Sequence, residues 1–512
     1  MTDTISARKF HERTKLPPDD GYDRRTPANL PQDHKAYVDL PRQPLSDRIR
    51  PPQVPALAAL SDGNPNPESP ATRTDIDRET LTQLCYHAAG ITSVREGERT
   101  IRFRAASCTG ALYHIDLYPV VGENGPIPAG VYHFDPLTCS VDVLREGDFR
   151  GVLADASGRH ERVGDAPVTF VTTSTWWRNA WKYSERTYRH AFWDSGTVLA
   201  NLLAVAHAQD LPAEAVLGFA DQRVAALLGV DIDDEAPLEL VPVGAGNPAP
   251  EAREMPNLSP ETEPLSPNPK QYPLITEAYR GSVLADGAAA RAWREAAAAP
   301  RERATATHPT ATQGKSIPLD PVGDDRASKA PLPVSIRRRR SHREYAPTPL
   351  NFRKFSTVLD RAVRSQPLDA TPGDDPLALL DCYLIINAVE GLESGSYQYH
   401  PGAGELEQLR SGQFREAATQ LALSQEWAGD AAVGVYFMAD LDAVVGRLGN
   451  RGYRAAQLEA GLLGGRLYLA TYAHRDLAGL GLTFRDDAVT EFFEPRAAGT
   501  TPMFHYVFGR PA

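Results

Sequence analysis

A repeated stretch organises this chain: PAGVYHFDPLTCSVDVLREGDFR (128–150) aligns without a gap with ESGSYQYHPGAGELEQLRSGQFR (393–415). The second stretch begins 265 residues after the first, and the same offset pairs Arg186 with Arg451 and Arg189 with Arg454. Asp221 meets Asp486 after a compensated slip of one residue. Because chance does not preserve one offset over about 130 positions, the pattern predicts an internal repeat.

The repeat suggests domain boundaries. We expect an N-terminal extension at 1–70, a first copy at 71–250, a linker at 251–325 and a second copy at 326–512. The linker is rich in Pro, Ala and Thr, which is typical of flexible segments. Within it, ITEAYRGSVLADGAAARAWREA (275–296) predicts a helix that lies against one of the copies.

Each copy alternates β-rich apolar runs with helical periodicity, which predicts mixed α and β structure. The clearest helix runs from about Arg186 to His207, and its counterpart begins near Arg451. Gly196 and Gly461 fall in the middle of these helices. Since glycine costs about 1 kcal/mol there relative to alanine, they indicate a close helix approach or a nearby ligand. A duplicated domain of this kind is a covalently linked two-fold dimer.

Composition narrows the function classes. Asp and Glu (66) exceed Lys and Arg (54), for a formal net charge of −12, which disfavours nucleic acid and anionic membranes as partners. We find no apolar run long enough to span a membrane and no signal peptide, so we expect a cytoplasmic protein. The four cysteines show no CxxC or zinc-type spacing, so neither a metal site nor a disulfide framework is expected.

Three segments carry chemical signals. The run IRRRRSHREY (336–345) concentrates arginines that repel one another unless an anion binds among them; a solvated basic linker end is the alternative. The segment RFRAASCTGALYHIDLY (102–118) predicts a loop whose backbone approaches a ligand, or else a plain turn into a strand. In STWWRNAWKYSERTYRHAFW (174–193), Lys182 and Tyr183 suit acid/base chemistry, although packing is the alternative.

These motifs in combination resemble a known family. RRSHREY (339–345), ASCTGALYHIDLY (106–118), WKYSERTYRH (181–190) and VFGRP (507–511) are similar to the nitroreductase superfamily of FMN oxidoreductases, and within it to the SagB-type dehydrogenases. The resemblance implies an α+β fold with two tandem nitroreductase-like domains that form an intramolecular pseudo-dimer. It also implies an FMN cofactor at the interface between the two copies.

The resemblance assigns site residues to both copies. Copy two would supply Arg339, Ser341 and Arg343 for the FMN phosphate, and a loop near the flavin ring with Gly479 and Gly481. Copy one would supply the remaining residues: the small-residue loop of Cys108, Thr109 and Gly110, and the pair Lys182 and Tyr183 for proton removal. The family's loop usually reads proline-serine-alanine-glycine, so Ser107, Cys108 and Thr109 depart from it.

Each copy lacks the site residues that the other copy retains. Copy one has no arginine-serine motif at its start, ATRTDIDRETL (71–81). Copy two has Arg447 and Leu448 at the positions of the Lys-Tyr pair, and TPGDDPLALL (371–380) in place of the small-residue loop. We therefore expect one composite FMN site per chain and an inactive second site.

The function that this resemblance implies is oxidation of azoline-like C–N bonds in a peptide or small metabolite, with a peptide-modifying cyclodehydratase as a possible partner. Three alternatives stay open: an NAD(P)H-dependent nitroreductase or quinone reductase, a different flavin-dependent dehydrogenation of a peptide or small metabolite, and a non-catalytic partner protein. We find no dinucleotide-binding, Walker, zinc-protease or serine-hydrolase motif in the sequence.

Overall fold

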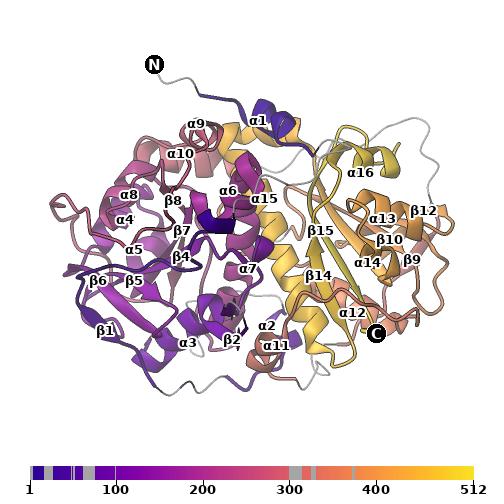
Figure 1. Cartoon of the computed structure of the whole chain (residues 1–512), viewed down its shortest axis with the longest axis horizontal. Coiled ribbons are helices and arrows are strands. Elements are labelled where there is room, and N and C mark those ends of the chain that lie inside the picture. The colour runs from indigo at the N-terminus through magenta and orange to yellow at the C-terminus, as the bar shows by residue number, and fades with distance from the viewer. Residues whose placement is uncertain are drawn as a thin grey trace.

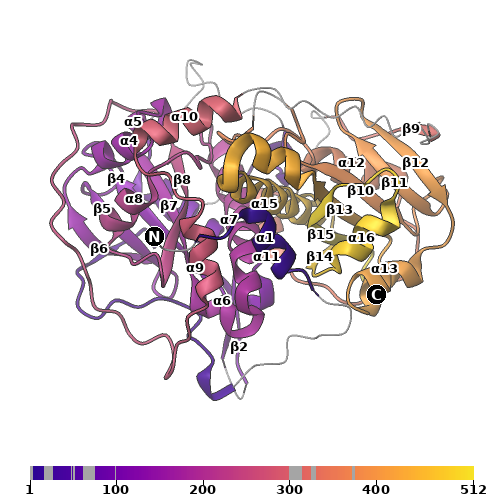
Figure 2. The ribbon, with the colours of Figure 1, turned by 90° about the horizontal axis from the view of Figure 1, so that it is seen from above.

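The computed structural model describes residues 4–16, 27–47, 49, 52–61, 75–97, 100–298, 314–323, 330–371 and 375–512. The two copies form two lobes, and their longest helices, α7 (Thr187–His207) and α15 (Leu441–Ala473), lie between them (Figure 1). Viewed from above, these two helices gather with α1 (Ala7–Arg13) and α9 (Pro273–Arg280) where the lobes meet (Figure 2). None of the helices in the described part of the chain combines the length and apolar character that crossing a lipid bilayer requires.

The N-terminal half of the chain forms most of the first lobe, although its helices α1 and α2 (Ala56–Ala59) pack on α15 of the second half. Its helices are α1 (Ala7–Arg13), α2 (Ala56–Ala59), α3 (Arg78–Ala89), α4 (Arg150–Ala156), α5 (Glu161–Asp165), α6 (Trp176–Tyr183), α7 (Thr187–His207) and α8 (Asp221–Leu228). Its strands are β1 (Arg42–Pro44), β2 (Ile91–Arg95), β3 (Ile101–Arg104), β4 (Ile115–Val121), β5 (Gly130–Asp135), β6 (Ser140–Glu146), β7 (Val168–Thr175) and β8 (Glu235–Val243).

The second half repeats this order. Its helices are α9 (Pro273–Arg280), α10 (Gly287–Ala297), α11 (Leu332–Arg338), α12 (Phe352–Ala362), α13 (Arg415–Leu421), α14 (Glu426–Asp430), α15 (Leu441–Ala473) and α16 (Asp486–Phe493). Its strands are β9 (Ser316–Pro318), β10 (Asp381–Ile386), β11 (Gly395–His400), β12 (Glu405–Ser411), β13 (Val433–Ala439), β14 (Ala478–Leu482) and β15 (Thr501–Gly509). The helix expected within the linker is therefore two helices, α9 and α10.

Each lobe has an antiparallel sheet with the same strand order. The order β6-β5-β4-β7-β8 in the first lobe recurs as β12-β11-β10-β13-β15 in the second. Even the edge strands correspond, because Gln43 of β1 pairs with Val141 and Ile317 of β9 pairs with Leu406, which lies 265 residues after Val141. The repeat thus extends upstream of residues 70 and 325, into the expected extension and the expected linker.

Buried charges join the lobes in a reciprocal pattern. Asp486 accepts hydrogen bonds from Arg186 at 3.0 Å and from Arg189 at 2.6 Å. Asp221 accepts from the equivalent residues of the other copy, Arg451 at 2.8 Å and Arg454 at 2.7 Å. A two-fold interface pairs residues in this crossed way, so the expected intramolecular pseudo-dimer is confirmed.

Helices α1 and α9 are equivalent elements of the two copies. Arg189 Nη2 donates to the carbonyl of His11 in α1 at 2.6 Å, and Arg454 Nη2 donates to the carbonyl of Tyr279 in α9 at 2.9 Å. Each copy therefore begins with a short helix that caps the arginines of its charge cluster.

The two long helices cross at their central glycines. A Cβ on Gly196 would lie 2.5 Å from the carbonyl carbon of Gly461, and a Cβ on Gly461 would lie 2.7 Å from the carbonyl oxygen of Phe192. The mid-helix glycines thus mark a close helix approach, one of the two expected explanations. Both helical segments begin after a kink with positive φ, at Ser184 and at Gly449, which are also 265 residues apart.

Candidate functional site

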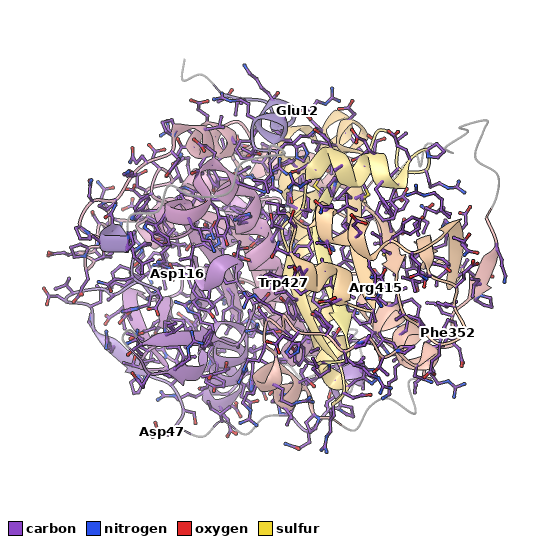
Figure 3. All side chains as sticks on the ribbon, turned by 45° about the vertical axis from the view of Figure 1, so that its right-hand side comes forward. Glu12, Asp47, Asp116, Phe352, Arg415 and Trp427 are labelled. Atoms are coloured by element: carbon purple, nitrogen blue, oxygen red, sulfur yellow. The ribbon has the colours of Figure 1, made fainter. Side chains whose placement is uncertain are left out.

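The arginine-rich segment forms a loop after α11. Ser341 and Arg343 are exposed, and neither side chain makes a hydrogen bond or ion pair with any residue that the structure describes. The Arg343 guanidinium lies 5.9 Å from the ring centre of Trp427, a residue labelled in Figure 3. An arginine cluster without acidic partners, with a free hydroxyl beside it, suits an anion such as a phosphate.

Arg339 points inward and joins the two copies. Its guanidinium donates to three carbonyl oxygens of copy one: Arg104 at 2.9 Å, Ala105 at 3.1 Å and Ala106 at 3.2 Å. These carbonyls directly precede the small-residue loop. The arginine motif therefore contacts the segment that leads into the small-residue loop, as expected. The Nε and Nη2 atoms of Arg339 make these contacts.

Gly479 and Gly481 lie in strand β14 rather than in a loop, unlike the sequence expectation. The carbonyl of Gly479 accepts from His342 N at 3.3 Å, so β14 lies beside the arginine loop. A Cβ on Gly479 would lie 1.9 Å from Tyr506 Oη, and Gly481 N donates to Tyr468 Oη at 2.7 Å. Close packing against tyrosines is thus a physical reason for glycine at these positions.

Hydrogen bonds to Asp194 of helix α7 hold the small-residue loop in place. Thr109 donates to Asp194 through its backbone N at 2.9 Å and its hydroxyl at 2.9 Å, and Cys108 Sγ lies 3.2 Å from the same carboxylate. Burial, followed by the Asp194 charge, raises the pKa of the Cys108 thiol well above its usual value. Gly110 has a φ of +66°, a left-handed conformation that favours glycine.

Lys182 and Tyr183 end helix α6 next to this loop. A Cβ on Gly110 would lie 2.8 Å from Tyr183 Oη, so the phenol touches the loop. Lys182 Nζ lies 4.9 Å from the centre of the Tyr183 ring. The Tyr183 ring meets the His190 ring edge-on at 4.7 Å. Burial, and then Arg186, lowers the pKa of His190 well below 6.5, so this imidazole is neutral at pH 7.

A polar network links these parts. Asn179 of α6 donates to the carbonyl of Thr109 at 3.4 Å, and its Oδ1 lies 2.9 Å from His190 Nδ1 and 3.0 Å from Thr187 Oγ1. Together with Arg339, this network connects the arginine loop, the small-residue loop and the Lys-Tyr pair in one continuous region. The arginine loop thus meets copy one through Arg339, Tyr183 lies against the small-residue loop, and β14 lies beside the arginine loop.

Two of the three tryptophans of α6, Trp176 and Trp177, lie at its N-terminal end, whereas Trp181 directly precedes Lys182. Trp176 Nε1 donates to the carbonyl of Ile232 at 3.0 Å, and Trp177 Nε1 donates to Ser266 Oγ at 2.9 Å. Both line a cavity of about 300 Å³ that Tyr272 and Asp234 also border. They lie about two helical turns from Tyr183, so they do not form one wall with it.

Several residues around the arginine loop had no role predicted from their motifs. Tyr472 of α15 donates to the carbonyl of Arg340 at 2.7 Å. The side chains of His342 and Arg510 each have a buried nitrogen, Nε2 and Nε, without a hydrogen-bond partner among the described residues. Arg510 lies beside the loop, because its carbonyl accepts from Ala346 N at 2.9 Å. Arg510 belongs to the VFGRP segment, which could have marked it. Buried unpaired nitrogens beside an arginine cluster suit a bound anion.

At the pseudo-symmetric second site, a described segment of copy two lies against copy one. Asp369 of copy two accepts from the backbone N atoms of Leu217 at 2.7 Å and Gly218 at 2.8 Å. Ala215 N donates to the carbonyl of Pro367 at 2.8 Å. Residues 215–218 are the counterpart of the β14 region beside the arginine loop, so a protein segment covers this surface in copy one. Burial raises the pKa of Asp369 to about 6.

Helix α10 closes the other side of the second site. Trp293 Nε1 donates to the carbonyl of Leu448, the counterpart of Tyr183, at 3.0 Å. Arg294 donates to the carbonyl of Gly218 at 2.8 Å. Residues 71–74, which were expected to lack an arginine motif, and residues 372–374 of the altered loop lie outside the described residues.

Comparison with known proteins identifies this architecture. A family model described as the nitroreductase family matches residues 114–245 and 336–493, more than half of the 512 residues. The crystal structure of a candidate nitroreductase from Anabaena variabilis matches 99% of this chain and 99% of its own, with a TM-score of 0.75 and 25% sequence identity. The expected α+β fold with two tandem nitroreductase-like domains is confirmed.

Curated proteins match shorter parts of the chain. A candidate nitroreductase of Methanocaldococcus jannaschii, MJ1384, is 25% identical over 164 residues, which is 32% of this chain and 78% of that protein. The trifolitoxin operon protein TfxC of Rhizobium leguminosarum bv. trifolii is 23% identical over 208 residues, 38% of this chain and 58% of that protein. The microcin B17-processing protein McbC of Escherichia coli is 28% identical over 134 residues, 25% of this chain and 49% of that protein. These matches agree with the expected resemblance to the nitroreductase superfamily and its SagB-type branch.

Proposed function

Because this chain belongs to the nitroreductase family, we propose that it is an FMN-dependent oxidoreductase with one composite flavin site. We propose further that it is a SagB-type dehydrogenase, which oxidises azoline-like C–N bonds in a peptide or a small metabolite. One observation carries the single-site proposal: Arg339 joins the arginine loop to the small-residue loop at one site, while Asp369 covers the equivalent surface at the other.

The residues at the open site fit the phosphate of FMN. Ser341 and Arg343 have donors that no described residue uses, and Arg510 has a buried Nε without a partner. These groups would hold the phosphate, and the loop of Thr109 and Gly110 would face the flavin from copy one. When bound, FMN would supply hydride transfer, which no protein side chain can perform.

The proposed chemistry requires a proton acceptor beside the substrate. Conversion of an azoline to an azole removes a hydride and a proton from the ring. The Tyr183 phenol, only 9% exposed, or Lys182 would take the proton. The similarity to TfxC and McbC supports a peptide substrate, because McbC is a processing protein of microcin B17. A peptide-modifying cyclodehydratase is then the partner that would make the azoline.

Flavin stoichiometry tests the composite site. We expect about one FMN per chain in the purified protein, measured from the visible spectrum after denaturation. Changing both Ser341→Ala and Arg343→Ala should weaken FMN binding at least about tenfold, because each contact to a charged group contributes about 1.5–3 kcal/mol. Arg353→Ala removes an exposed arginine that pairs with Asp320 and should leave FMN bound. Two FMN per chain would contradict the single site, and none, even with added FMN, would favour a non-catalytic partner protein.

Reduction by nicotinamide separates the dehydrogenase from the alternative. A SagB-type dehydrogenase should oxidise a synthetic thiazoline peptide with oxygen as acceptor. Rapid bleaching of the bound flavin by NADPH, together with no turnover of the thiazoline, would instead identify a nitroreductase or quinone reductase.

A further inference from the structure

Three side chains beneath the small-residue loop converge on one point. Asp194 Oδ2 lies 3.2 Å from Cys108 Sγ and 2.9 Å from His114 Nε2, and the three ligand-type atoms all lie within 4.8 Å of one another. His114 is fully buried and Asp194 is 4% exposed. With metal–ligand bonds of about 2.0–2.3 Å, the sulfur–oxygen and nitrogen–oxygen separations in a tetrahedral zinc site are only a few tenths of an ångström longer than these two distances from Asp194 Oδ2.

Each of the three atoms is oriented by a second partner. Tyr113 N donates to Cys108 Sγ at 3.1 Å, as backbone N–H groups do to metal-bound thiolates. His114 Nδ1 lies 2.8 Å from Ser174 Oγ, which fixes the imidazole so that Nε2 faces the cluster. Thr109 orients the Asp194 carboxylate: its hydroxyl donates to Oδ1 at 2.9 Å, and its backbone N is shared between Oδ1 at 2.9 Å and Oδ2 at 3.0 Å, so that Oδ2 faces Cys108 and His114. Such outer partners are a regular feature of metal sites.

We propose that Cys108, His114 and Asp194 bind a divalent cation of the zinc type, with a water molecule in the fourth position. One sulfur, one nitrogen and one oxygen ligand suit zinc and not the oxygen-preferring Mg²⁺ or Ca²⁺. A thiolate, a carboxylate and a neutral imidazole balance the charge of a divalent ion, so the burial of the ion leaves no net charge.

A small cavity borders two of the three proposed ligands and is the space from which a water molecule would reach the fourth position. The cavity has room for about one water molecule and is lined by Cys108 and Asp194 together with Arg104, Ala106 and Tyr113. Binding replaces the thiol proton of Cys108 by the metal and releases that proton to solvent. The site would attach the small-residue loop to α7. It differs from the sequence expectation of no metal site, because Cys108 and His114 are six residues apart and Asp194 comes from a distant helix.

Cobalt substitution tests the site. The purified full-length protein, dialysed against a chelator, is titrated with Co²⁺ and followed by absorption at the red end of the visible spectrum, where flavin does not absorb. We expect one Co²⁺ per chain with the strong d–d bands of a four-coordinate site and a thiolate-to-cobalt band in the difference spectrum. Cys108→Ser should remove the thiolate band and weaken Co²⁺ binding at least about tenfold, whereas Cys139→Ser should change neither.

The outcomes distinguish this proposal from the flavin proposal. If no Co²⁺ binds to a chain that circular dichroism shows to be folded, or if Cys108→Ser keeps the thiolate band, the cluster is a hydrogen-bonded one and the proposal is wrong. Asp194→Asn and His114→Gln provide the same test from the other two ligands. The Ser341→Ala and Arg343→Ala changes should leave the cobalt spectrum intact even where FMN is lost.

Discussion

Tyr183 is the side chain whose removal best tests the proposed chemistry. Tyr183→Phe keeps the ring packed on His190 and beside Lys182 but loses the hydroxyl next to Gly110. We expect turnover of a thiazoline peptide to fall by roughly 10²–10⁴-fold, the usual contribution of a positioned acid or base. FMN content should not change. The measurement is kcat at saturating substrate, with Tyr272→Phe as the control, and an unchanged kcat would transfer the proton-removal role to Lys182.

A second residue, Glu239, predicts a pH dependence of stability. Burial raises its pKa to about 7, although its Oε2 accepts from Ser195 at 2.6 Å and from Thr172. Its Oε1 has no partner. Because the folded state holds this proton more tightly than the unfolded state does, the stability that it contributes is complete at low pH and is lost as pH rises from about 4.5 to about 7.

Glu239→Gln should remove that slope. Between pH 5 and pH 8 the free energy of unfolding of the wild type should fall relative to the variant by on the order of 3 kcal/mol, measured by urea unfolding at each pH. Because both proteins share all other titrating groups, the difference between their unfolding free energies at each pH reports on Glu239 alone. Parallel pH profiles would mean that Glu239 is ionised in the folded protein at pH 7.

At the scale of elements, α7 and α15 can cross closely only because Gly196 and Gly461 have no side chain at the crossing point. Gly196→Ala would place a Cβ 2.5 Å from the backbone of Gly461, which α7 and α15 can relieve only by moving apart. We expect the free energy of unfolding to fall by at least about 1–3 kcal/mol, as it does when a core is overpacked. Gly446→Ala lies in α15 with no atom within 4 Å of its new Cβ, and should stabilise the protein by about 1 kcal/mol. Equal effects of the two changes on the melting temperature would contradict the proposed steric cause.

Elements also show where sequence patterns suffice and where they do not. The 265-residue offset predicted which elements are equivalent, and β5 and β11, or α8 and α16, begin at that spacing. The glycines of β14 were interpreted as a loop because their contacts with Tyr468 and Tyr506 are long-range, and local sequence does not carry them. Helix α10 closes the second site through Trp293, and a Pro- and Ala-rich linker contains no periodic signal for that contact.

For the whole molecule, the 265-residue offset predicted which residues of the two copies are equivalent, but not which residues contact each other. Arg186 and Arg451 are visible as a repeated pair in the sequence, yet each bonds the aspartate of the other copy, a result of the two-fold arrangement. The candidate site follows the same rule. Arg339 belongs to a recognisable motif, and the fold adds its hydrogen bonds to the carbonyls of residues 104–106 before the small-residue loop. Asp369 belongs to no such motif, so its contacts with Leu217 and Gly218 required the three-dimensional structure.

The crossed aspartates predict how strongly the two copies depend on each other. Burial alone would raise the pKa of Asp486, but Arg186 and Arg189 lower it well below its usual value, so the carboxylate stays ionised and paired. Asp486→Asn or Asp221→Asn leaves two buried arginines without a counter-charge, and each should cost about 3–5 kcal/mol of unfolding free energy. Asp487→Asn changes the neighbouring carboxylate, which is 70% exposed and pairs with Lys15, and should cost less than about 1 kcal/mol.

Thermal unfolding of the three variants is the measurement. A loss of stability in only one of the two buried variants would mean that the two aspartates do not contribute equally to the interface between the copies. Equal losses, in a single transition, would mean that the copies unfold as one unit, because each aspartate stabilises the long helix of the opposite copy.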